Sequence, residues 1–337
     1  MKMDSGRILK LLFSVGGILI LAALIWKVGL ERWEILLRGM DKTVLLWAPA
    51  VYALAWLFRT LRLRSLIRHT PGNLSLSRTF EIHIAGFALN AVMPVKAGDV
   101  AMIGLLKREG IKIGPATAMV VQTRILDILA MVLVMIPSWF WLTRKDAPLW
   151  MLSSFLICLA LAAVPFGIAW ADQQRRISSL AAKAGGKAER PLWGLFLVKF
   201  GEAYDAYHGM ARDRSLLLRT VLASILVWLC EGGVCYTLFL ALGVGIPFEA
   251  AVLAVVLGNA GKGFQVTPGG IGVYEGILTA VLCEFGAPFD AAVTVAVLDH
   301  LLKKGFNLAI GLYALVRLGG SAGLRDAGAS SSSFNTK

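Results

Sequence analysis

Apolar runs of about 20 residues recur along this chain, and each is long enough to cross the hydrocarbon core of a bilayer as a helix. In lipid, backbone N–H and C=O groups must be paired inside the protein, so only helices and closed β-barrels span a membrane. Barrel strands would appear as short segments of alternating polarity, and the sequence shows none. Only 16% of the residues are charged, against about 25% in a soluble domain. The sequence therefore predicts an all-α, polytopic helical membrane protein.

Six of the apolar runs are continuous, and we interpret them as full spans of a single transmembrane domain over residues 1–318. The first run follows Lys2, Arg7 and Lys10 and resembles a signal peptide. It is longer than a signal peptide and lacks a small-residue cleavage site, so we interpret it as a retained span. The predicted spans cover residues 8–28, 43–63, 116–142, 149–170, 216–243 and 288–318.

Two further apolar stretches, about 81–108 and 248–285, are each interrupted by a proline and glycines. The first contains Pro94 and Gly98, and the second contains Pro268-Gly269-Gly270 and Gly272. Proline removes a backbone donor and glycine supplies no side chain to pack, so each stretch is expected to be two short helices. An acid follows each break, Asp99 in the first and Glu275 in the second. Paired broken segments in two halves of a membrane chain are typical of a binding site at a repeat interface.

Basic residues set the expected orientation. Arginines cluster after the second span, and eight Lys or Arg lie between residues 172 and 214. The positive-inside rule then places the N-terminus and an amphipathic linker, 171–215, in the cytoplasm. With the six spans counted as crossings, the two broken hairpins enter the membrane from opposite faces, as in an inverted repeat. If either hairpin is counted as a full crossing, the orientation of every later segment is reversed. The Gly-, Ala- and Ser-rich tail, 319–337, is predicted to be disordered.

Many charged groups fall at membrane depth, where each costs about 2.5–3.5 kcal/mol on insertion scales unless it is paired or faces a polar cavity. Arg124 and Asp127 are three residues apart, so they can form a structural ion pair or line a cavity. Lys304 has no local partner and is expected to face a cavity. His300 is expected to be a packing residue. The candidates for the translocation site are Lys96, Asp99, Arg124, Asp127, Glu231, Lys262, Glu275, Asp299, His300 and Lys304, and Asp299 has Lys303 as an alternative structural partner.

The Pro-Gly turns also expose helix-end amides, which favour anions. Together with Lys96, Arg124, Lys262 and Lys304, they suit an anionic head group such as phosphate. The alternative is that the glycines serve only for tight backbone packing.

At these residues the chain resembles the lysylphosphatidylglycerol synthase transmembrane-domain family, over roughly residues 10–318. The motifs are Asn90-Ala-Val-Met-Pro94-Val-Lys96-Ala-Gly98-Asp99 with Arg124-Ile-Leu-Asp127, and Thr267-Pro-Gly-Gly-Ile-Gly-Val-Tyr-Glu275. The resemblance implies a helical bundle with re-entrant elements that moves lipids between leaflets. It marks Asn90, Pro94, Gly98, Arg124 and Asp127 in the first half, and Pro268, Gly269, Gly270, Gly272 and Glu275 in the second.

Three positions depart from the family pattern. Thr123 occupies a position where the family often has Glu. In the loop the family often has Arg followed by Gly-Glu, and here Lys96 and Asp99 fill comparable roles. His300 occupies a position where the family often has Arg. Family members that aminoacylate lipids carry a large soluble domain, whereas the longest polar stretch here is about 45 residues, too short for one.

We therefore expect a flippase or scramblase for an anionic phospholipid or a polyisoprenoid-type lipid, without a catalytic domain, in the bacterial inner membrane. The alternative is a secondary transporter of a soluble anion, coupled to protons through Asp299, His300 or Glu231. No cofactor or metal is expected, because the four cysteines lie in apolar segments without Cys-x-x-Cys spacing. The net charge of +13 lies mostly in loops, which favours anionic lipid over nucleic acid as the partner. A homo-oligomer and a separate lipid-modifying enzyme stay open as further partners.

Overall fold

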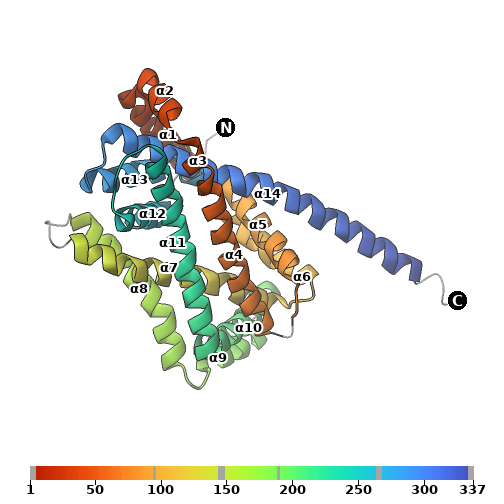
Figure 1. Ribbon diagram of the computed structural model, residues 1–337. Coiled ribbons are helices and arrows are strands. Elements are labelled where there is room, and N and C mark those ends of the chain that lie inside the picture. The colour runs from red at the N-terminus through yellow and green to blue at the C-terminus, as the bar shows by residue number, and fades with distance from the viewer. Residues whose placement is uncertain are drawn as a thin grey trace.

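The computed structural model describes residues 5–70, 72–93, 96–142, 149–187, 190–262 and 268–332. Helices make up nearly all of these residues, and the described part of the chain contains no strand. Figure 1 shows the helices as a bundle from which the last helix projects toward the C-terminus. The prediction of an all-α membrane protein is confirmed.

In chain order the elements are α1 (Ser5–Val28), α2 (Leu30–Gly39), α3 (Lys42–Leu45), α4 (Trp47–Arg68), α5 (Leu76–Val92), α6 (Ala97–Arg108), α7 (Ile113–Leu142), α8 (Leu149–Ala171), α9 (Arg176–Gly186), α10 (Pro191–Arg212), α11 (Arg214–Ala241), α12 (Phe248–Lys262), the short 3-10 turn η1 (Pro268–Gly270), α13 (Val273–Glu284) and α14 (Phe289–Ser332).

Three helical stretches of the described residues are long and apolar enough to cross a membrane: Lys42–Arg68, Ile113–Pro137 and Arg214–Ala241. Two shorter apolar stretches, Gly16–Val28 and Leu159–Ala171, fall within α1 and α8. Helix α14, which contains the predicted span 288–318, is not among the three, and it carries Asp299, Lys303 and Lys304 in its middle.

Helices α4 and α11 form an antiparallel pair at the centre of the bundle (Figure 1). At one end, the N–H of Asp41 donates to the C=O of Ala241 at 2.7 Å. At the other end, His69 Nδ1 lies 3.4 Å from the Asp213 carboxylate. Asp41 and Asp213 are also the N-caps of α3 and α11, because their carboxylates accept backbone N–H groups of the first turn.

Each interrupted stretch forms a pair of short packed helices. Helices α5 and α6 follow the Asp213 end of the central pair, and α12 and α13 follow its Asp41 end. Helix α5 contacts η1, so the two turns lie close together. The chain breaks where the sequence predicted, since Met93 is extended, Lys96 is left-handed with φ 53°, and Gly269, Gly270 and Gly272 all have positive φ.

The linker and the tail are more regular than the sequence indicated. Within the predicted linker, α9 and α10 form a helical hairpin, and the two helices approach closely at Gly185 and Gly201. The last predicted span ends at residue 318 with disorder expected beyond it, whereas α14 continues to Ser332. Extending an existing helix adds one hydrogen bond for each residue fixed, which favours continuation over a new start. Residues 333–337 lie outside the described residues.

Candidate functional site

The turn between α5 and α6 is held by Asn90. Its Oδ1 accepts the N–H of Gly98 at 2.8 Å, and its Nδ2 donates to Asp99 Oδ1 at 2.8 Å. Gly98 is required here, because a Cβ at this position would collide with the carbonyl oxygen of Gly86. The first motif therefore positions Asp99 through a side-chain amide. Pro94 lies outside the described residues, and Lys96 is exposed at the turn.

Asp99 is the main partner of Arg124 on α7. Arg124 donates to both Asp99 oxygens, with Nε 3.2 Å from Oδ2, whereas its Nη1 lies 3.8 Å from Asp127. Asp127 instead binds Arg62 of α4, which also donates to Ser224 at 2.8 Å. The predicted Arg124–Asp127 contact is thus the weaker link in a chain that joins α4, α7 and the first hairpin.

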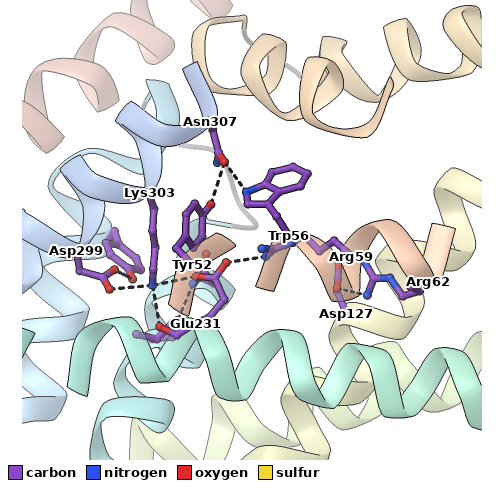
Figure 2. A network of polar contacts seen from close by, with 12 residues as sticks. Tyr52, Trp56, Arg59, Arg62, Asp127, Glu231, Asp299, Lys303 and Asn307 are labelled. Carbon is purple, nitrogen blue, oxygen red and sulfur yellow. Dashed lines mark hydrogen bonds and ion pairs between the residues drawn. The ribbon is translucent and has the colours of Figure 1, made fainter. Parts of the chain in front are cut away.

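A second network lies along α11, and Figure 2 shows it beside the Arg62–Asp127 pair. Glu231 accepts from Arg59 at 2.7 Å and from Lys303 at 2.9 Å. Lys303 also donates to Asp299 at 2.8 Å, and Asp299 accepts the hydroxyl of Tyr274 at 2.6 Å. All five side chains are buried, with exposed fractions of 7% or less. This network connects α4, α11, α13 and α14.

Aromatic and amide groups complete the two networks. Tyr52 and Trp56 both donate to Asn307 Oδ1 at 3.0 Å (Figure 2). The Phe87 ring lies between Arg59 and Arg124, 5.4 and 5.1 Å from their guanidinium carbons, within cation–π distance of both.

Glu275 caps α13 and pairs with His300. One carboxylate oxygen accepts the N–H of Gly272 at 2.7 Å, and the other lies 2.6 Å from His300 Nδ1. Gly272 has φ 82°, and a Cβ there would collide with the carbonyl oxygen of Gly17 on α1. From the sequence, His300 is expected to be a packing residue. The structure gives it a charged partner as well, while its Nε2 is buried without a hydrogen bond among the described residues.

Lys262 and Lys304 have no carboxylate within ion-pair distance among the described residues. Both are half-buried, and they lie beside adjacent glycines of the turn. The Lys262 ammonium lies 3.6 Å from the centre of the Tyr274 ring, and its stem packs against Gly270. The Lys304 ammonium occupies the space that a Cβ of Gly269 would need. The glycines of η1 therefore let two cations approach the turn backbone.

Charges in the two networks balance, and those at the second turn do not. Arg59 and Lys303 match Glu231 and Asp299, while the other network pairs two arginines with two aspartates. At the second turn, Lys304 lies near Glu275, which His300 and Gly272 already occupy. The carboxylates near Lys262 are Glu231 and Asp299, which Arg59, Lys303 and Tyr274 already occupy. An excess of positive charge thus remains where the two hairpins meet.

Arg59 and Arg62 are not among the candidates predicted from the sequence, because they were grouped with the arginines that cluster at the end of the second span. They lie one turn apart on α4 and both point into the bundle, with exposed fractions of 5% and 1%. Their position inside the predicted span 43–63, beside Trp56, was the available signal. Tyr274 and Asn307 were also missed, since an uncharged polar residue in a span carries little signal.

The described residues contain no group of three His, Cys, Asp or Glu side chains that could hold a metal ion. Cys230, Cys235 and Cys283 are free thiols.

The sequence model of the lysylphosphatidylglycerol synthase TM region matches residues 7–311. The chain is 24% identical over 313 residues to the UPF0104 membrane protein PH1989 of Pyrococcus horikoshii, which covers 87% of this chain and 92% of that protein. It is 23% identical over 329 residues to a UPF0104 membrane protein of Methanothermobacter thermautotrophicus, covering 90% and 94%. It is also 24% identical to the glycosyltransferase AglD of Haloferax volcanii, covering 93% of this chain and 55% of AglD.

Proposed function

This chain belongs to the family of the lysylphosphatidylglycerol synthase TM region, and on that premise we propose that it moves a lipid with an anionic head group between the leaflets of a membrane. The lipid would be an anionic phospholipid or a polyisoprenoid-type lipid, and the protein would act as a flippase or scramblase. The expected setting is the bacterial inner membrane with a cytoplasmic N-terminus.

The observation that carries this proposal is the unpaired cation pair Lys262 and Lys304 at the meeting point of the hairpins. A cation at mid-membrane depth is costly, and a phosphate would neutralise it. Gly269 and Gly270 of η1 have positive φ, and successive backbone N–H groups in such turn conformations can form concave sites that favour anions. A head-group phosphate thus suits both the charge excess and the turn.

Movement between leaflets would follow from the arrangement of the hairpins. Because they begin at opposite ends of the α4–α11 pair, we propose that each is re-entrant and that they form an inverted repeat. Rocking of one half against the other would open the cation pair to each leaflet in turn.

One relative's name adds a candidate head group. AglD is called a glycosyltransferase, and this chain matches 55% of it. Because that name refers to sugar transfer, a lipid that carries a sugar is a further candidate substrate.

The buried Glu275–His300 pair favours a second candidate, a proton-coupled transporter of a soluble anion. Protonation of either group would change the charge beside Lys304. The two candidates differ in whether the transported anion carries a hydrocarbon chain.

The test is translocation of a fluorescent anionic lipid in proteoliposomes. We expect Lys304→Gln and Lys262→Gln to reduce the initial rate at least tenfold, and Lys304→Arg to keep most of it. Lys107→Gln, which removes an exposed lysine at the end of α6, is the matched control and should leave the rate unchanged. Equal rates for the wild-type protein and protein-free vesicles would refute the function.

A further inference from the structure

Lys304 lies at the edge of the face of α14 that is exposed outside the bundle. Four large side chains on this face have exposed fractions of 55–75%, namely Leu301, Leu312, Tyr313 and Val316. Lys304 follows Leu301 by three residues, so the two side chains are neighbours on the helix surface. Lys303, one position earlier, points to the opposite side and is buried in the Glu231 network. The unpaired cation is thus reachable from the exposed side of the helix.

The two hairpin turns meet beside the Lys304 ammonium group. The position of a Cβ on Gly269 lies beside Lys304 Nζ and 3.5 Å from the carbonyl oxygen of Ala91. Val92 directly follows Ala91 and Ile271 lies two residues after Gly269, and their exposed fractions are 67% and 39%. Exposed apolar side chains of α5, of the segment after η1 and of α14 therefore lie within three residues of the groups that meet at this cation.

We infer that the cation site opens sideways into the bilayer between Val92, Ile271 and Leu301, and that the hydrocarbon chain of the bound lipid lies over these residues. This lateral opening rests on the proposed function and narrows its substrate to an amphiphile, with a phosphate at Lys304 and a chain left in the bilayer. A soluble anion would bind the ammonium group but would gain nothing from the exposed Val, Ile and Leu side chains around it, since these make favourable contacts only with apolar groups.

Contact with lipid alone does not distinguish this opening from the rest of the membrane-facing surface. Leu222 of α11 is also exposed, with a fraction of 51%, and touches bulk lipid in the same way. The distinguishing property is charge dependence. Chain contact at the lateral opening should require Lys304, because the phosphate holds the lipid there, whereas contact at Leu222 should not.

The experiment is photolabelling in proteoliposomes with phosphatidylglycerol that carries a diazirine in its acyl chain, followed by peptide mass spectrometry. In the wild-type protein we expect labelling at Val92 and Ile271 to exceed labelling by the same-chain phosphatidylcholine probe. Lys304→Gln should reduce the phosphatidylglycerol labelling of these positions at least threefold, and Lys304→Arg should restore it. Labelling of Leu222 should stay constant in every variant, and Lys107→Gln should match the wild type.

A second arm separates the two sources of phosphate. Excess glycerol 3-phosphate on both sides of the vesicles should leave the chain labelling within twofold of its original level, because the chain keeps the lipid at the opening. Loss of labelling with this competitor, or labelling that is indifferent to Lys304, would overturn the lateral opening. If translocation still depends on Lys304 in that case, the proposed function stands without the opening. If labelling depends on Lys304 but no lipid is translocated, the opening stands and the function fails.

Discussion

Two adjacent lysines on α14 lie in opposite environments. Lys303 donates to Glu231 and Asp299 inside the bundle, while Lys304 is half-buried and has no carboxylate in ion-pair distance within the part of the chain that the structure describes. Successive helix positions are separated by about 100°, so one short segment can serve both the packed interior and a binding site. Of these two neighbouring residues, Lys303 therefore stabilises the fold, and Lys304 is the one available to bind a ligand.

Glu231→Gln should strongly destabilise the protein. The change leaves Arg59 and Lys303 buried beside a neutral amide, and removing one partner of a buried pair typically costs about 3–5 kcal/mol. Glu34→Gln is the matched control, because the Glu34–Arg38 pair is exposed and such pairs contribute about 0–1 kcal/mol. Unfolding in detergent, followed by circular dichroism, compares the two. Equal losses would mean that the buried network does not hold the helices together.

Gly272→Ala should destabilise the protein, whereas Gly276→Ala should not. Alanine at 272 must adopt φ near 82°, and left-handed backbone costs about 1–2 kcal/mol before the collision with Gly17 is counted. Gly276 lies in a regular turn of α13, and a Cβ there meets Ile20 at an ordinary 3.6 Å. Melting temperatures in detergent measure both changes. A normal melting temperature for Gly272→Ala would show that α1 can move away from the turn.

At this scale the sequence was informative about charges and about the Asp299–Lys303 pair within one helix, which the structure confirms, but it gave no information about partners on different helices. It singled out Asp99, Arg124, Glu231 and Glu275 from the cost of charge in lipid. It paired Arg124 with Asp127 because only local spacing is visible in a sequence, whereas Asp99 comes closer through the turn of the first hairpin. The bond between His300 and Glu275 joins two helices, and helical periodicity gives no information about such contacts.

At the scale of elements, helices α4 and α11 are linked at both ends of their pair through contacts of Asp41 and Asp213. Asp213 accepts the N–H of Leu216 and lies beside His69, and these two contacts hold the pKa of its carboxyl below the usual range. Because the pKa is lower in the folded state, the stabilisation is complete above the pKa of the unfolded chain. It is lost as the pH falls through the folded pKa.

Asp213→Asn should therefore lower the melting temperature at neutral pH, and the difference from wild type should shrink as the pH falls below about 4, near the ordinary pKa of Asp. Thermal unfolding in detergent across this range measures it. Asp205→Asn on α10 serves as the control. A difference that grows toward acid would contradict the role of the ionised carboxylate.

The elements themselves were largely predictable, and their lengths were less so. Apolar runs and the Pro-Gly breaks indicated where helices begin and where the two hairpins turn. The helical form of the linker was visible as an apolar periodicity, and Leu192, Trp193 and Phe196 are indeed exposed on one side of α10. The start of α14 was predicted to within one residue, but its C-terminal end was not, since Gly in residues 319–332 disfavours helix and the residues there favoured an earlier end.

For the whole molecule, the two hairpin mouths should be accessible from opposite sides of the membrane. Ser77 and Glu284 are exposed near the open ends of the first and second hairpins. In a chain whose native cysteines are replaced, a cysteine at Ser77 should react with an impermeant maleimide from the same side as one at Lys187. A cysteine at Glu284 should react from the side of Glu34, because α2 meets the start of α14 through the Arg32–Asp290 pair.

Labelling of intact cells measures the reaction from the outer side of the membrane, and labelling of inverted vesicles measures it from the cytoplasmic side. Reaction of the Ser77 and Glu284 positions from one side would mean that a hairpin crosses the membrane fully, which would remove the inverted repeat. The cytoplasmic assignment of Lys187 is tested by the same comparison.

The charge balance of the two buried networks has an electrical consequence. A group of paired charges with no net charge does little work when it moves through a transmembrane voltage, whereas one elementary charge moved across 100 mV corresponds to about 2.3 kcal/mol. The voltage dependence of the transport cycle would then reside in Lys262, Lys304 and the anion between them. The moving site would carry a different net charge when it returns empty than when it returns with a bound lipid. The membrane potential would therefore act differently on these two steps, and the resting voltage of the cell would set the direction of net lipid movement.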